Sequence, residues 1–191
     1  MLYIMIKPKS YSTSLSFSFG SNNNTKNMER KKIEDELDCK SNANKIWASL
    51  RDLYYVYPKA FPPGTYKSID VLHGDGVHPG SIRVRTYKEG SPITMFKEKI
   101  EVVDEEKKIF GFSIIGGDLL KDYKSFKMSI QVVPKDDDDD GNDQGSLLKM
   151  SCEYEKIALH NPDPIHVKDF AFKLLKQLDD YTAPQLYDKI V

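Results

Sequence analysis

The stretch YKSIDVLHGDGVHPGSIRVRTY, residues 66–87, decides how the fold is interpreted. A run of alternating apolar and polar residues stands on each side of a short loop, and the loop holds three glycines, a proline and an aspartate. This arrangement is typical of two β-strands joined by a turn. Glycine-rich loops also bind phosphate groups, so the loop at residues 73–81 is first considered as a nucleotide site.

The candidate residues of this loop are Gly74, Asp75, Gly76 and Gly80. A phosphate-binding P-loop ends in Gly-Lys-Ser or Gly-Lys-Thr, but here Gly80 is followed by Ser81. A dinucleotide fingerprint leads from a strand into a helix, whereas this loop leads into a second strand. We therefore interpret the loop as a structural connection, in which glycine permits positive φ angles that other side chains disfavour.

The periodicity of the rest of the chain predicts an α+β fold. Strand-like runs cover residues 33–40, 66–72, 81–87, 93–104, 107–115, 123–134 and 146–157. Two short helices are predicted after the first strand, one at 41–53 and one within 54–64 that is broken by Pro62 and Pro63. A long amphipathic helix begins near Pro164 and continues to Tyr181. An antiparallel sheet wrapped around a long helix can leave a cavity, and such cavities bind small molecules.

The composition favours one globular domain with no polyanionic partner. The chain has 191 residues, 39% of them hydrophobic, and a formal net charge of −1. Nothing here favours binding to nucleic acid or to an anionic membrane, and no apolar run is long enough to span a bilayer. We expect a monomer. Cys39 and Cys152 lack a CxxC spacing and are predicted to be buried free thiols in a reducing compartment.

Metal and cofactor sites are not predicted. The four histidines lack the spacing of zinc ligands. The aspartate run at Asp136–Asp140 is interpreted as a solvated hairpin loop, since its spacing is not that of an EF-hand, although cation binding stays an alternative.

The N-terminal segment differs from the rest of the chain. Residues 1–27 are rich in serine and contain no acidic residue. A Ser-rich, acid-poor segment fits a plastid transit peptide, but the absence of arginine favours an extension outside the fold. We therefore predict a disordered extension at 1–27, a domain at 28–191 and a cytoplasmic protein, with a plastid location as the alternative.

A series of motifs along the domain resembles the plant major latex proteins, a group within the Bet v I superfamily of helix-grip proteins. The motifs are KAFP (59–62), YKSIDVLHGDGVHPGSIR (66–83), TYKEGSP (86–92), KEKIEVVDEE (97–106), GDLLKDYKSFK (117–127), VVPK (132–135) and SCEYEK (151–156). The resemblance runs from about Ile33 to Tyr181. It implies a seven-stranded curved antiparallel sheet that grips a long C-terminal helix over an apolar cavity. It also implies binding of small hydrophobic plant metabolites or hormones, their transport or storage, and a link to defence and stress responses.

The strand and helix patterns supply candidate lining residues for that cavity. Alternation places apolar side chains from several strands on one face, and the pattern alone fits an ordinary packed core as well. The candidate set is Tyr57, Phe96, Glu98, Ile100, Phe110, Phe112, Ile114, Phe126, Met128, Ile130, Met150, Tyr154, Phe170, Ala171 and Leu174. Val102 is assigned to the same face as Phe96 and Ile100.

Glu98 is the charged member of this set. A carboxylate that faces an apolar interior has its pKa raised by desolvation unless it is paired. Two interpretations follow: a salt bridge or rim position, or a polar anchor for a ligand hydroxyl or amine.

Three catalytic or signalling alternatives are less well supported. In the related norcoclaurine synthases the catalytic Tyr and Lys would fall on Phe96 and Phe110, which cannot exchange protons. Ribonuclease activity proposed for class-ten pathogenesis-related proteins would fall on Arg83, Asp179 and Tyr181. A ligand-dependent interaction protein of the hormone-receptor type needs a gate motif that EGSPI (89–93) does not match. We therefore predict no enzyme.

Overall fold

The computed structural model describes residues 29–135 and 145–183. The first strand β1 (Lys31–Cys39) is followed by two helices, and the remaining strands precede the long C-terminal helix. The other elements are α1 (Ala43–Arg51), α2 (Tyr57–Ala60), β2 (Tyr66–His73), β3 (Ile82–Tyr87), β4 (Met95–Asp104), β5 (Ile109–Gly117), the 3-10 helix η1 (Asp118–Lys121), β6 (Tyr123–Pro134), β7 (Ser146–Lys156) and α3 (Ile165–Thr182).

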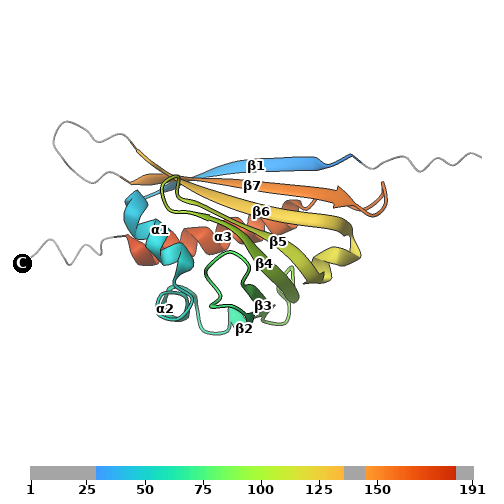
Figure 1. The fold of residues 1–191 in the computed structure, drawn as a ribbon, viewed down its shortest axis with the longest axis horizontal. Helices are drawn as coiled ribbons and strands as arrows, with labels where there is room; N and C mark the ends of the chain where they lie inside the picture. The colour runs from blue at the N-terminus through green and yellow to red at the C-terminus, as the bar shows by residue number, and fades with distance from the viewer. Residues whose placement is uncertain (1–28, 136–144, 184–191) are drawn as a thin grey trace, which may run out of the picture.

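The strands form one antiparallel sheet in the order β1-β7-β6-β5-β4-β3-β2. The sheet arches over α3, and α1 and α2 lie near one end of that helix (Figure 1). The predicted fold class is therefore confirmed, with its seven strands, two short helices after the first strand and a long C-terminal helix. The aspartate run, Pro184 and the predicted N-terminal extension lie outside the described residues.

Apolar periodicity explains how the sheet and α3 meet. On β6, Phe126, Met128, Ile130 and Val132 are buried, and the residues between them are more exposed. The inward side of β7 follows the same period of two. On α3, Val167, Leu175 and Leu178 are buried along one face, as helical spacing predicts. The two apolar faces meet in a single core.

Two predicted details of the elements are wrong. The second helix begins at Tyr57 instead of Tyr54, although it ends at Ala60, before Pro62, as predicted. Val102 does not share the face of Phe96 and Ile100, because the pairing of β4 with β5 shifts its register between Ile100 and Val102. A bulge of this kind reverses the side on which later residues point, and the Val102 side chain is accordingly 45% exposed.

The glycine-rich loop joins β2 to β3 and has the backbone that the sequence predicts. Gly74, Gly76 and Gly80 have φ angles of 72°, 83° and 91°. The Asp75 carboxylate accepts hydrogen bonds from the backbone N–H groups of Val77 and His78, both at 2.9 Å. These bonds hold the pKa of Asp75 below its usual value. The Asp75 side chain therefore stabilises the turn from within the loop, while β4 accepts from the Gly80 N–H at the Ile100 carbonyl oxygen, 2.8 Å away.

Both cysteines are free and buried, as predicted. Cys39 ends β1 and Cys152 lies on β7. Burial raises the pKa of each thiol to about 12, so both stay protonated at neutral pH.

Candidate functional site

A small cavity lies between the inner face of the sheet and α3. Its volume is about 80 Å³. Its walls come from α1, α2, α3 and strands β2 to β6, and are mostly aromatic or aliphatic. The lining residues are Leu50, Tyr57, Phe61, Tyr66, Arg85, Tyr87, Phe96, Phe110, Phe112, Met128, Ile130, Ala171, Leu174, Leu175 and Leu178. We refer to this space as the inner cavity.

Aromatic side chains account for the small volume of the inner cavity. The rings of Tyr57, Phe61, Tyr66, Tyr87 and Phe96 form a continuous series, in which successive centroids lie 5.1, 5.3, 4.9 and 5.8 Å apart. These spacings are those of well-packed aromatic pairs. Drug-sized ligands occupy cavities of roughly 300 Å³ or more, so a larger ligand would need the walls to move.

The structure brings only part of the predicted set to the inner cavity. Eight predicted residues line it: Tyr57, Phe96, Phe110, Phe112, Met128, Ile130, Ala171 and Leu174. Seven do not: Glu98, Ile100, Ile114, Phe126, Met150, Tyr154 and Phe170. Alternation identifies every inward-facing side chain, whereas the cavity occupies only part of the inner face.

Most of the seven take part in packing elsewhere. Phe126 and Tyr154 both pack on Tyr123, with ring centroids 5.3 and 5.6 Å apart. The Tyr154 hydroxyl donates a hydrogen bond to Asp163 at 2.6 Å. Ile100, Ile114 and Met150 are buried in the same core.

Sequence reasoning missed seven lining residues: Leu50, Phe61, Tyr66, Arg85, Tyr87, Leu175 and Leu178. A signal for most of them was present. Leu175 and Leu178 share the helical spacing of Ala171 and Leu174. Arg85 and Tyr87 lie two residues apart on β3 and therefore face the same side of the sheet. Arg85 is hard to select from the sequence because arginine is rarely buried.

A buried ionic cluster lies beside the inner cavity. Arg83 and Glu98 are fully buried, and Arg85 is 8% exposed. The Nε atoms of Arg83 and Arg85 donate hydrogen bonds to the same oxygen, Glu98 Oε1, at 2.5 and 2.9 Å. Arg83 Nη2 is also 2.5 Å from Oε1 but too poorly aligned for a hydrogen bond. Of the two interpretations of Glu98, the ion pair is therefore the one present.

Arg83 also connects this cluster to the glycine-rich loop. Its Nη1 atom donates a hydrogen bond to the Gly76 carbonyl oxygen at 2.9 Å. Registry between β3 and β4 aligns Arg83 with Glu98, which sets the geometry of the pair. Burial lowers the pKa of Arg83, and Glu98 acts in the opposite direction.

A second hollow opens where the loops meet α3. It has a volume of about 260 Å³ and is lined by Pro62, Pro63, Gly64, Thr65, Lys88, Ser91, Phe170, Lys173, Leu174 and Gln177. We refer to it as the mouth. Leu174 lines both the mouth and the inner cavity. The Phe170 ring packs on Tyr87, with centroids 5.0 Å apart, so these side chains separate the two spaces.

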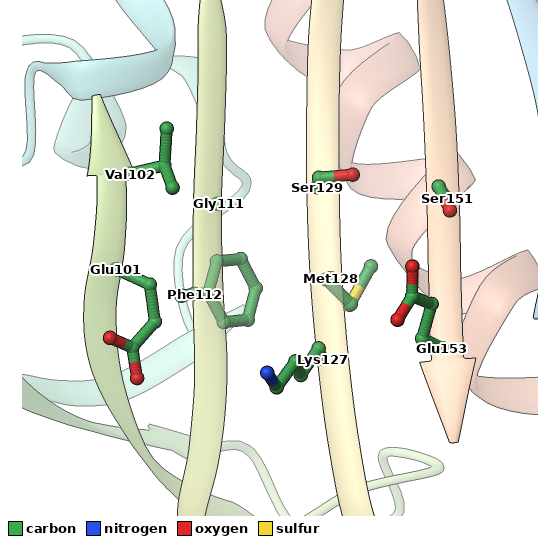
Figure 2. Close-up of a pocket in the computed structure, with 9 residues that line it drawn as sticks. All are labelled: Glu101, Val102, Gly111, Phe112, Lys127, Met128, Ser129, Ser151 and Glu153. Carbon is green, nitrogen blue, oxygen red and sulfur yellow. The ribbon is translucent and has the colours of Figure 1, made fainter. Parts of the chain in front are cut away.

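A third hollow, with a volume of about 270 Å³, is a furrow on the outer face of the sheet. Figure 2 shows it crossing four strands, β4 to β7, with Gly111, Ser129 and Ser151 in adjacent positions. Glu101, Lys127 and Glu153 lie beside this row. Small side chains on neighbouring strands produce the depression, and the exposed Val102 lies at one end. The furrow and the inner cavity lie on opposite faces of the sheet, and Phe112 and Met128 line both.

The family model described as the pathogenesis-related protein Bet v 1 family matches residues 28–184. The chain belongs to this family. It is 50% identical over 151 residues to MLP-like protein 423 of Arabidopsis thaliana, an alignment that covers 78% of this chain and 92% of the relative. It is also 33% identical over 128 residues to Ribonuclease 1 of Panax ginseng, which covers 66% of this chain and 78% of the relative.

Solved structures of the family agree with the fold. The ginseng major latex-like protein 151 matches with a TM-score of 0.67 at 23% identity, over 81% of this chain and 99% of that one. The truncated norcoclaurine synthase of Thalictrum flavum matches with a TM-score of 0.60 at 25% identity, over 81% and 92%. The 50% identity to MLP-like protein 423 is twice the identity to the synthase, whereas the ginseng major latex-like protein 151 is as distant in sequence as the synthase is. The Bet v 1 family is known for binding small hydrophobic ligands.

Four of the five residues considered for catalysis have structural roles in this member of the family, and the fifth, Tyr181, is exposed. Phe96 and Phe110 line the inner cavity and carry no ionisable group. Arg83 is occupied by Glu98 and Gly76. Asp179 is buried near the end of α3, where its two carboxylate oxygens accept hydrogen bonds from the backbone N–H groups of Lys40 and Ser41 at 3.0 and 2.9 Å. These contacts fix the packing of α3 against the end of β1.

Among the described residues, no group of three or more His, Cys, Asp or Glu side chains is placed to hold a metal ion. Within residues 29–135 and 145–183, no helix combines the length and apolar character needed to cross a membrane.

Proposed function

We propose that this protein binds a small hydrophobic plant metabolite or hormone in the inner cavity, and that it transports or stores this ligand in defence or stress responses. The binding of hydrophobic ligands by the family supports the proposal. The observation that carries it is the inner cavity itself, which has walls from the sheet and α3 and adjoins the mouth through Leu174. Aromatic walls favour a flat or aromatic ligand.

Ligand entry requires movement of the Phe170 and Leu174 side chains, which lie between the mouth and the inner cavity. The inner cavity holds about 80 Å³ and the mouth about 260 Å³, so joining them gives room for a drug-sized molecule. Phe170 and Leu174 are only partly buried, which makes a change of rotamer at these positions inexpensive. In the proposed model the ligand stabilises the joined arrangement because it binds that state better.

The experiment measures binding of the neutral dye N-phenyl-1-naphthylamine, whose fluorescence rises in apolar surroundings. Leu174→Trp places a larger side chain between the two spaces and is expected to weaken binding at least fivefold. Val102→Trp is the matched control, because it adds the same ring on the outer face of the sheet. Melting temperatures of both variants establish that they are folded. Weaker binding in Val102→Trp, with full binding in Leu174→Trp, would assign the dye to the furrow and refute the proposal.

We also propose that the protein acts as a cytoplasmic monomer. Light scattering after size-exclusion chromatography measures the mass, and a dimer would contradict the first part. Residues 1–27 fused to a fluorescent protein test the second part, because import into plastids would show that this segment directs the protein there.

A further inference from the structure

We propose that the ligand is a hydrophobic carboxylic acid whose carboxylate pairs with Arg85. This inference rests on the proposed function, since it names the chemical class that the inner cavity selects. Four observations support it: the net charge of the buried cluster, the free end of Arg85, the two phenols beside it, and the charges at the mouth.

The buried cluster carries an excess positive charge. Arg83 and Arg85 contribute two guanidinium groups, and among the described residues Glu98 contributes the only carboxylate that pairs with them. Both guanidinium groups bond to the same oxygen, Oε1. Burying an unbalanced charge is costly, so an anion that reaches the cluster is favoured.

Arg85 is the member of the cluster that a ligand can reach. Arg83 is fully buried and bonds to Glu98 and Gly76, whereas Arg85 lines the inner cavity. Only Nε of Arg85 donates a hydrogen bond to another described residue, and its Nη atoms donate none. Its side chain is 9% exposed, so this free end lies inside the protein. A guanidinium with free Nη groups matches the two oxygens of a carboxylate.

Two phenols lie near Arg85, and because their hydroxyls share one hydrogen bond, the pair offers one further neutral donor. The rings of Tyr66 and Tyr87 both line the inner cavity and lie 4.9 Å apart. Burial raises the pKa of Tyr87 to about 12 and that of Tyr66 well above its usual value, so both keep their protons at neutral pH. The hydroxyl of Tyr57 already donates to the Leu50 carbonyl oxygen at 2.8 Å.

No acidic side chain lines either space among the residues that the structure describes. The α3 residues that face the inner cavity are Ala171, Leu174, Leu175 and Leu178, all apolar. At the mouth, Lys88 and Lys173 are the charged lining residues, and neither forms an ion pair with another described residue. Both charges therefore attract an anionic ligand towards the entrance.

A carboxylate fits better than a phosphate. One negative charge balances the excess of the cluster, whereas a phosphate dianion would exceed it. A carboxylate also requires less space in a cavity of about 80 Å³. The remainder of such a ligand would contact the aromatic walls and Leu174.

The experiment compares two ligands with the same carbon skeleton, 4-phenylbutanoate and 4-phenylbutan-1-ol, as competitors of the bound neutral dye at pH 7 and low salt. The acid is expected to displace the dye at a concentration at least tenfold lower than the alcohol. Equal displacement by both would overturn the carboxylate proposal but leave hydrophobic binding intact. Absence of dye binding and of any effect of either competitor would overturn the proposed function together with this inference.

Three variants assign the preference to Arg85. In Arg85→Met the preference for the acid, measured as the ratio of the two displacing concentrations, is expected to fall below twofold. Arg85→Lys keeps a positive charge and is expected to keep part of the preference. Lys176→Met removes a charge from the exposed side of α3, outside both hollows, and is expected to keep all of it. A full preference in Arg85→Met, or the same loss in Lys176→Met, would overturn the assignment.

Discussion

Replacement of Glu98 by glutamine is expected to destabilise the fold far more than replacement of Arg85 by methionine. Glutamine has the shape of glutamate and can still accept a hydrogen bond, but it has no charge. Arg83 and Arg85 would then be two buried cations without a counterion. Arg85→Met instead leaves one cation opposite one anion, Arg83 with Glu98.

The contact distances set the size of the effect. Arg85 Nε lies 2.9 Å from Glu98 Oε1. At the effective dielectric constant of about 20 that suits protein sites, an attraction at this distance is worth about 6 kcal/mol before desolvation. Breaking a buried pair by removing one partner costs about 3–5 kcal/mol in measured cases. We expect about 3–5 kcal/mol for Glu98→Gln and less than about 1.5 kcal/mol for Arg85→Met, which keeps most of the side-chain volume.

Equilibrium unfolding in urea at pH 7, followed by tryptophan fluorescence and by far-ultraviolet circular dichroism, measures both values. Coincident transitions establish two-state behaviour. A domain of this size has about 5–15 kcal/mol of stability, so Glu98→Gln should remain measurable at low temperature. If Glu98→Gln costs no more than Arg85→Met, the two arginines do not depend on Glu98 for their charge balance, and the argument for an excess buried charge fails.

Three further outcomes are expected. Gly76→Ala should lower the unfolding free energy more than Gly80→Ala. Alanine at a positive φ angle costs about 1 kcal/mol at either position, but only at Gly76 would the new Cβ also lie 2.7 Å from a Val71 methyl group. Equal urea midpoints for the two variants would contradict this. Cys39 and Cys152 should not react with Ellman's reagent at pH 8 until the protein unfolds, and rapid labelling of the folded protein would refute this. The unfolded thiols lose their protons from about pH 8.5 upwards, while the folded thiols keep theirs to about pH 12. The unfolding free energy should therefore fall as the pH rises through that range. A chain starting at Met28 should keep its melting temperature, since residues 1–27 have no core-facing periodicity, and a large decrease in calorimetry would disprove the predicted boundary.

Much of the fold could be predicted from local patterns in the sequence. Alternation identified the inward side of β6 and β7, and helical spacing identified α3, because each pattern depends only on neighbouring residues. The predicted inward orientation of Val102 was wrong because a β-bulge depends on how β4 pairs with β5 and not on either strand alone. The start of the second helix was predicted too early, because only the residues from Tyr57 to Ala60 are helical. Its end was predictable, because Pro62 stops the helix.

The site was less predictable than the fold. Phe126 and Tyr154 face inward as predicted, but they pack on Tyr123 and do not reach the inner cavity. A pattern gives the direction of a side chain and not the volume left between its neighbours. Arg85 was missed for a different reason: its burial depends on Glu98 across the β3–β4 pair, a contact that only the register reveals.

The glycine-rich loop that suggests a phosphate site is connected through side chains to the inner cavity. Asp75 holds the loop by accepting from Val77 and His78. The backbone at Gly76 presents its carbonyl oxygen to Arg83 at 2.9 Å. Arg83 shares the carboxylate of Glu98 with Arg85, and only Arg85 reaches the cavity. One carboxylate carries a single negative charge, so Glu98 cannot neutralise both arginines. In the proposed binding mode the loop therefore acts indirectly: its Gly76 carbonyl holds Arg83, and Arg83 and Arg85 together keep a positive charge at the cavity wall.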